Sequence, residues 1–154
     1  MWPKLRKQIA LELDQLNRLL ETHRPLLQQC LRTPPSDIEL SALAAMLHSF
    51  YTGIENILKR VALESDGAMP SGEFWHRELL AAMTRSCKVR PPVISCTLAE
   101  GLREYLEFRH VFRQAYTFDL RWDKMRALVL GCEETFRTLG AELNAFLRAG
   151  PTSP

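Results

Sequence analysis

Residues 37–64 read DIELSALAAMLHSFYTGIENILKRVALE, and their apolar side chains are spaced as on one face of an α-helix. Large apolar residues recur every three or four positions, which predicts a buried helical stripe of Leu43, Leu47, Phe50, Ile54, Ile57 and Val61. Pro34 and Pro35 interrupt the preceding segment, and Ser36 or Asp37 can cap the new helix. This stretch therefore predicts a long helix with one face in the core.

The same periodicity extends outward in both directions, and no segment shows a two-residue alternation. Pro25 is expected to bend or interrupt the first helix near its end, and SDGAMPSGE is expected to form a mobile loop. Asp123 is expected to cap the last helix. The sequence predicts an all-α, up-and-down bundle of four long helices and one short helix. The predicted segments are 3–31, 37–64, 74–86, 95–116 and 123–149, in a single domain over 1–149 with a disordered tail over 150–154.

Composition limits the possible functions. Twenty Lys and Arg residues against 18 Asp and Glu residues give a net charge of only +2, far from that of a nucleic-acid coat protein. Any contact with nucleic acid must therefore involve a few local arginines. The four cysteines have no CxxC spacing and are predicted to be reduced, mostly core thiols of a cytoplasmic protein. No apolar run is long enough for a membrane span, so no membrane contact is predicted.

The segment 107–119, EFRHVFRQAYTFD, places arginines on an apolar helical stripe. At about 100° per residue, Arg109 falls in the middle of the stripe formed by Leu98, Leu102, Tyr105, Phe112 and Tyr116, and Arg113 falls at its edge. Burying an unpaired guanidinium costs several kcal/mol. Two hypotheses follow. Either the arginines pair with carboxylates, with Glu55 as the best candidate, or Arg109 and Arg113 form a fork that binds one phosphate.

No metal or cofactor site is predicted, because the four histidines do not pair at metal-ligand spacing and no HExxH motif or glycine-rich phosphate loop is present. His48 and His76 lie at the flanks of apolar stripes. Both are predicted to be boundary histidines with satisfied hydrogen bonds.

The segment FRHVFRQAYTFDLRWDKM resembles the signature of the HepT-like ribonuclease domains of the HEPN group. The motif of that family is Arg, four residues, a polar residue that is usually histidine, one residue, then Tyr. Here it falls on Arg109, Gln114 and Tyr116. The blocks LHSFYTGIENILKRVA, GEFWHRELLAAM and DLRWDKMRALV also resemble the family, so the likeness covers about residues 40–147.

The resemblance implies an all-helical toxin that cleaves RNA without a metal, by attack of the ribose 2′-OH on the adjacent phosphate. It implies that Arg109 stabilises the phosphorane charge. Arg113, through the fork with Arg109, and His110 are predicted as further contacts to the RNA phosphate. The resemblance also implies a MntA-type nucleotidyltransferase antitoxin as partner, and nucleotidylation of Tyr116, whose added phosphates would block the arginine site. Gln114 departs from the family, because a glutamine can hold a phosphate but cannot transfer a proton.

Three readings therefore stay open: a ribonuclease toxin with weakened chemistry, an inactive partner-binding module of the same fold, and a plain helical adaptor whose arginines pair with carboxylates. On a regular helix Arg109 and Gln114 would project about 140° apart, so one helix could not easily aim both at one phosphate. We therefore expect a homodimer with a composite site formed by two copies of this helix.

Overall fold

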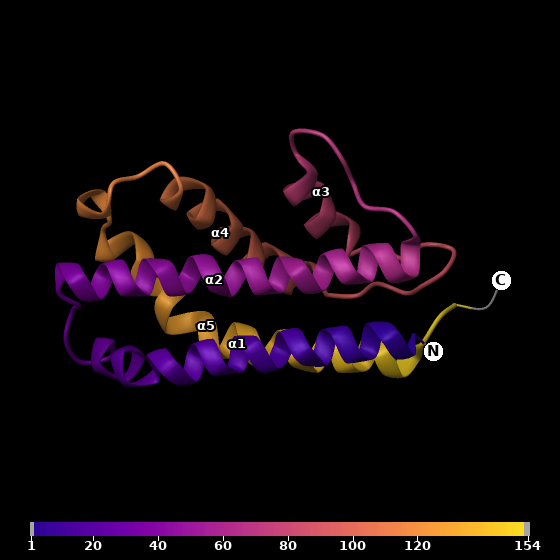
Figure 1. Ribbon diagram of the computed structural model, residues 1–154, viewed down its shortest axis with the longest axis horizontal. Helices are drawn as coiled ribbons and strands as arrows, with labels where there is room; N and C mark the ends of the chain where they lie inside the picture. The colour runs from indigo at the N-terminus through magenta and orange to yellow at the C-terminus, as the bar shows by residue number, and fades with distance from the viewer. Residues whose placement is uncertain (1, 153–154) are drawn as a thin grey trace.

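The computed structural model describes residues 2–152 (for Thr117 the backbone only) and confirms an all-α bundle (Figure 1). Within these residues there are four long helices and one short helix, namely α1 (Pro3–Cys30), α2 (Asp37–Val61), α3 (Trp75–Ala82), α4 (Cys96–Phe112) and α5 (Trp122–Ala149). A π-helical turn, η1 (Ala62–Asp66), extends α2, and a 3₁₀ turn, η2 (Thr117–Asp119), precedes α5. No β-strand occurs in the described part of the chain, only an isolated bridge between Cys87 and Arg90.

Helix α2 is the centre of the bundle and contacts all four other helices. Figure 1 shows α1 running antiparallel beside α2, with α5 behind them, while α3 and α4 lie along the other side of α2. The predicted stripe of α2 forms the middle of the core, since all six of its members are 0% exposed. Burial of this stripe on a single helix therefore organises the whole domain.

The beginning of α2 matches the prediction in detail. Ser36 is the N-cap, and its hydroxyl accepts a hydrogen bond from the backbone N–H of Glu39 at 3.2 Å. The Glu39 carboxylate in turn accepts from the backbone N–H of Ser36 at 2.9 Å. This reciprocal capping box satisfies two backbone donors that would otherwise lack partners at the helix start.

The predicted end of α4 is wrong, because the helix stops at Phe112 rather than near Tyr116. The backbone N–H of Gln114 donates to the carbonyl three residues back, that of Val111. The N–H of Ala115 is shared between the carbonyls of Val111 and Phe112. Such tightening to a three-residue spacing ends a helix where the chain must turn toward the next one.

Other predicted boundaries also differ from the structure. Helix α3 is shorter than predicted, and Arg121, not Asp123, is the N-cap of α5, without a side-chain cap. Helix α1 continues through Pro25 to Cys30.

Two polar clusters position α3 and α4. Arg90 is 2% exposed and binds Asp66 through two hydrogen bonds, Nε to Oδ1 at 2.7 Å and a terminal nitrogen to Oδ2 at 2.9 Å. It also donates to the backbone carbonyl of Arg85 at 2.8 Å, which ties the loop after α3 to the end of η1. Ser95 caps α4, and Glu142 of α5 accepts from both its backbone and its hydroxyl.

The four cysteines are free, as predicted, but only Cys30 and Cys132 are buried, while Cys87 and Cys96 are exposed. The prediction of mostly core thiols is therefore half right.

Among the described residues, no helix combines the length and the apolar character that crossing a membrane requires. In the tail, the backbone N–H of Thr152 donates to Val89 at 3.0 Å, and residues 153–154 lie outside the described residues. Disorder of the tail stays a prediction.

Gly53 allows α1 and α2 to approach each other. A Cβ atom at Gly53 would lie 2.6 Å from Cδ2 and 3.1 Å from Cγ of Leu16, which is itself buried. We expect Gly53→Ala to lower the free energy of unfolding by about 1–2 kcal/mol, because overpacking outweighs the gain of about 1 kcal/mol in helix propensity. Denaturant unfolding followed by circular dichroism measures this difference.

Gly140→Ala in α5 is the matched control. No atom lies within 4 Å of a Cβ built there, so only the helix propensity changes. We expect this variant to gain about 0.5–1 kcal/mol. An equal gain in both variants would contradict the close packing at Gly53.

Candidate functional site

Arg109 is buried and ion-paired with Glu55. The Arg109 side chain extends from α4 to α2, where one of its terminal nitrogens lies 3.0 Å from each oxygen of the Glu55 carboxylate. The other terminal nitrogen donates to the hydroxyl of Thr52 at 3.2 Å. The guanidinium carbon also lies 4.9 Å from the centre of the Tyr51 ring, within cation–π range. The side chains of Arg109 and Glu55 are only 3% and 4% exposed, so each neutralises the other where water cannot.

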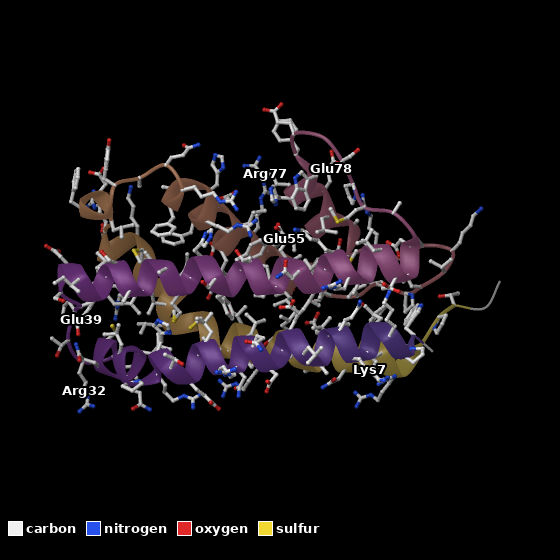
Figure 2. All side chains as sticks on the ribbon, in the orientation of Figure 1. Lys7, Arg32, Glu39, Glu55, Arg77 and Glu78 are labelled. Carbon is white, nitrogen blue, oxygen red and sulfur yellow. The ribbon has the colours of Figure 1, made fainter. Side chains whose placement is uncertain are left out.

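His76 of α3 joins the same carboxylate. Its Nδ1 lies 2.7 Å from Oε2 of Glu55 and 3.2 Å from the nearer nitrogen of Arg109. The neighbouring Trp75 ring stacks on the imidazole with a centroid distance of 3.6 Å. The expectation of a satisfied histidine is therefore confirmed for His76. We name Tyr51, Thr52, Glu55, His76 and Arg109 the Glu55 cluster. Glu55 lies in the C-terminal half of α2, on the side of that helix that faces α3 and α4 (Figure 2).

Tyr51 is unusual within the Glu55 cluster. Its hydroxyl is buried and has no hydrogen-bond partner in the described structure. Burial raises the pKa of Tyr51 far above its ordinary value, the Glu55 carboxylate raises it further, and Arg109 lowers it. The phenol therefore stays neutral and presents its ring face to the Arg109 guanidinium.

His48 does not fit the prediction of satisfied hydrogen bonds. Its Nδ1 is buried and has no partner within the described residues. Burial lowers the pKa of His48 below its ordinary value, and the positive charges of Arg113 and Arg109 lower it further. The imidazole packs against Phe112 at a centroid distance of 5.7 Å. His48 is therefore held as a neutral side chain beside two arginines.

The motif residues that follow Arg109 lie at the exposed end of α4. His110 is exposed in the last turn, and Arg113 is the exposed C-cap residue. Arg113 makes no salt bridge with any carboxylate among the described residues. Gln114 and Tyr116 lie beyond the helix, and both are exposed. Of the two motif arginines, therefore, only Arg109 pairs with Glu55, and Arg113 is exposed without a carboxylate partner among the described residues.

This geometry changes two arguments made from the sequence. Arg109 is buried while Arg113 is exposed, so the two guanidiniums do not form one accessible fork. Gln114 lies outside α4, so the calculated projection of about 140° between Arg109 and Gln114 does not apply. The homodimer loses that supporting argument and stays a prediction.

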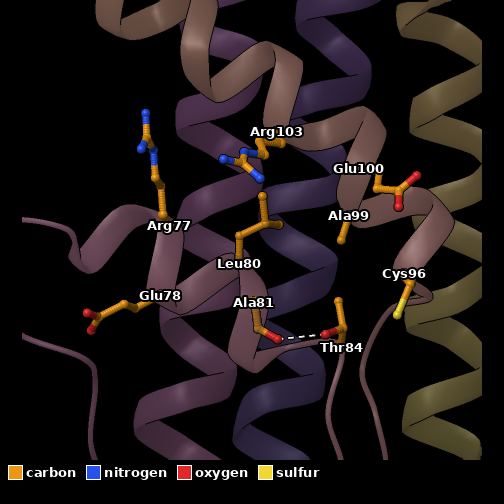
Figure 3. Close-up of a pocket in the computed structure, with 9 residues that line it drawn as sticks. All are labelled: Arg77, Glu78, Leu80, Ala81, Thr84, Cys96, Ala99, Glu100 and Arg103. Carbon is orange, nitrogen blue, oxygen red and sulfur yellow. Dashed lines mark hydrogen bonds between the residues drawn. The ribbon is translucent and has the colours of Figure 1, made fainter.

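Two surface grooves flank the site. One, of about 490 Å³, lies between α4 and α5 and is lined in part by Phe108, Val111, Ala115 and Leu128. The other, of about 440 Å³, lies between α3 and α4 (Figure 3). Its floor contains Leu80 and Ala99, with Arg77 and Arg103 at one end and Cys96 toward the other. Within the described residues, no group of three or more His, Cys, Asp or Glu side chains is arranged to hold a metal ion.

The Arg109–Glu55 pair was one of two alternatives predicted from the sequence. The contact of His76 with the same carboxylate was not predicted. The available signal was a histidine early in a predicted helix, next to an aromatic residue. This signal does not indicate which residue His76 contacts. Its contact with Glu55 depends on how the loop after η1 places α3 against α2. The same limitation hid the partner of Arg90.

Comparison with known protein families places these features in a wider context. A family model described as HepT-like protein matches residues 42–150 of the chain. The match covers α2 almost completely, the Glu55 cluster, all of α4 and α5, and the motif residues from Arg109 to Tyr116. Comparison with curated proteins and with solved structures gives no significant match. Because the family model spans more than half of the sequence and the fold agrees with it, the chain belongs to the HepT-like family of HEPN-type helical domains.

Proposed function

We propose that this HepT-like domain is the toxin of a toxin–antitoxin pair and cleaves RNA without a metal ion. Membership of the family suggests a toxin–antitoxin module of the HEPN type. The observation that carries the proposal is the arrangement of the motif. Arg109 is buried near the end of α4, and Arg113, Gln114 and Tyr116 are exposed at that end and just beyond it. Transfer of a phosphoryl group from one oxygen to another needs chiefly positioning and positive charge, and arginines supply both.

Exposed aromatic rings beside Arg113 support RNA as the ligand. Tyr116 and Phe118 are 70% and 81% exposed, and their rings stack 5.2 Å apart with an angle of 7° between planes. Such flat aromatic surfaces next to arginines bind the bases of single-stranded nucleic acid. In this proposal Arg113 and His110 contact the RNA phosphates. Arg109 contributes charge from below, and a direct contact between Arg109 and phosphate requires its guanidinium to leave Glu55.

A second candidate function is an inactive module that binds a MntA-type nucleotidyltransferase. Gln114 favours this alternative, because the usual motif histidine is absent. The exposure of Tyr116 is compatible with nucleotidylation by such a partner under either function. The third hypothesis, a plain helical adaptor, required both arginines to pair with carboxylates. Arg109 pairs with Glu55, which agrees with it, whereas Arg113 forms no salt bridge among the described residues.

Cleavage of total RNA and of tRNA in EDTA by the purified protein tests the proposed function. We expect the wild type to cleave and to leave 2′,3′-cyclic phosphate ends. Arg113→Ala should weaken RNA binding and cleavage by about 10- to 100-fold, since a hydrogen bond to a charged group contributes about 1.5–3 kcal/mol. Arg113 is exposed and unpaired among the described residues, so its removal should not affect folding.

Arg32→Ala is the matched control, because Arg32 is also an exposed arginine and lies after α1 at the opposite side of the bundle from α4 (Figure 2). Its activity should equal that of the wild type. Equal losses in both variants would mean that only net charge matters. No cleavage by the wild type would reject the ribonuclease and favour the partner-binding module.

A further inference from the structure

Building on the proposed ribonuclease function, we propose that His76 is the base that accepts the proton of the attacking 2′-OH, in place of the motif histidine that Gln114 replaces. Proton transfer in this reaction needs a side chain that can gain and lose a proton near neutral pH, and histidine is the usual one. Gln114 cannot do so. The structure holds another histidine, from a different helix, on the carboxylate that binds the motif arginine.

The contact with Glu55 orients the His76 ring. A carboxylate accepts hydrogen bonds, so the 2.7 Å contact assigns the hydrogen of the neutral imidazole to Nδ1. Nδ1 then cannot accept from Arg109, and the 3.2 Å approach between them is a close contact rather than a second hydrogen bond. This assignment leaves the lone pair of Nε2 available as a base. When Nε2 takes up a proton, the buried Glu55 carboxylate stabilises the resulting imidazolium.

Arg109 acts here through Glu55. Its nitrogen contacts both carboxylate oxygens, which prevents the carboxylate from rotating away from His76. In this scheme Arg109 and Glu55 are positioning residues, and His76 is the residue that touches the substrate. The arrangement therefore connects the family's arginine to a proton-transfer group without any contribution from Gln114.

The other three histidines are less suitable. His110 is exposed in the last turn of α4 and contacts no carboxylate among the described residues. The Nδ1 of His48 is buried and has no partner among the described residues, so no carboxylate orients this ring or balances the charge of its protonated form. His23 contacts the backbone carbonyl of Leu19 in α1, at 2.9 Å from Nδ1. Within the described part of the chain, His76 is the histidine that contacts a carboxylate.

RNA can reach His76 from the groove between α3 and α4. The His76 side chain is 29% exposed, whereas Glu55 beneath it is buried. His76 is not one of the groove's lining residues, but it is the neighbour of Arg77 and lies one helical turn before Leu80, both of which line the groove.

Arg77 and Arg103 stand at one end of the groove, and Glu78 and Glu100 also line it (Figure 3). Arg103 lies 3.3 Å from Glu107 in an exposed ion pair, which phosphate would have to compete with, so Arg77 is the readier phosphate contact. In this proposal a single-stranded segment lies along the groove with its ribose next to His76.

The chemical step balances without a metal or redox partner. The 2′ oxygen forms a bond to the adjacent phosphorus as its proton passes to Nε2 of His76. The bond from phosphorus to the 5′ oxygen breaks, and that oxygen takes a proton from water. The products are a 2′,3′-cyclic phosphate and a 5′-hydroxyl end. The imidazolium then returns its proton to the solvent.

His76→Asn tests this role with little change to the fold. The asparagine amide nitrogen occupies nearly the position of Nδ1 and can still donate to Glu55, but asparagine has no base in place of Nε2. We expect cleavage of a single-stranded RNA in EDTA to fall by about 10²–10⁴-fold. Thermal unfolding should stay close to that of the wild type. His23→Asn, a matched histidine replacement on α1, should cleave like the wild type.

Imidazole provides a second test, because a purely structural histidine is not replaced by a base from solution. His76→Ala should regain cleavage in proportion to added imidazole, and His76→Asn, whose side chain still fills the site, should respond less. Wild-type cleavage by His76→Asn would overturn the role of His76 and leave the proposed ribonuclease intact. If the His76 variants lose cleavage and added imidazole does not restore it in His76→Ala, then His76 is a positioning residue and its proposed role as the base is wrong. No cleavage by the wild type would reject both proposals.

Discussion

Glu55→Ala is expected to lower the free energy of unfolding by about 3–5 kcal/mol. The substitution leaves Arg109 charged and buried, with the neutral Thr52 hydroxyl, Tyr51 ring and His76 imidazole as neighbours but no carboxylate. A buried charge without its counter-ion is among the most costly defects that one substitution can create. Urea denaturation followed by tryptophan fluorescence and by circular dichroism measures the loss. Arg109→Ala should also lower the free energy of unfolding, but by less, because the buried Glu55 carboxylate keeps its contact with His76.

The double variant Glu55→Leu/Arg109→Met separates the cost of an unpaired charge from the value of the pair. Apolar replacement of both partners often costs little, so we expect the double variant to be more stable than either single variant. Glu134→Ala is the surface control. The Glu134–Arg137 pair is 71% exposed on both sides, and its loss should be barely measurable. A loss in the double variant equal to the sum of the two single losses would contradict this account.

The burial of Arg109 means that its variants can lose activity through unfolding. From the sequence alone, Arg109→Ala is expected to abolish RNA binding or toxicity with little loss of fold. The structure predicts a large loss of stability instead, since Arg109 is buried in the Glu55 cluster. Lost activity in that variant therefore indicates a role in chemistry only where folding has been measured on the same protein.

Gln114→His is expected to raise RNA cleavage by at least about tenfold, within the range of about 10²–10⁴ that a proton-transfer group typically contributes. The position is exposed just beyond α4, so the larger ring meets no packed core. A histidine there can protonate the leaving 5′ oxygen, a step that water performs in the scheme proposed for His76. Initial rates with a fluorescent single-stranded RNA in EDTA measure the gain.

Gln114→Asn is the control, because it changes the size of the side chain but adds no group that can transfer a proton. It should show no gain. If His76 and the histidine introduced by Gln114→His serve different steps, their effects should multiply in the variant that carries both Gln114→His and His76→Asn. An unchanged rate in Gln114→His would show that this position takes no part in proton transfer in this protein.

The fold was largely predictable because each long helix carries its own apolar stripe. The stripe of α2 was identified residue by residue and is fully buried, and the capping signal at Ser36 was also identified. Helix ends were less predictable. The end of α4 at Phe112 depends on where the chain must turn to begin α5, and no local signal between Phe112 and Tyr116 marks it. An error of four residues there was enough to misplace Gln114.

The sequence by itself determined the class of fold, the family, and the presence of an arginine in the apolar stripe that needs a partner, because local periodicity and motif order are properties of neighbouring residues. The tertiary structure alone decided between the two hypotheses for Arg109, by bringing Glu55 from α2 and His76 from α3 within 3.2 Å of its guanidinium. These residues are 54 and 33 positions away in the chain. The partner of a buried charge depends on which helices pack together, and the packing follows from burial of the whole core rather than from any one segment.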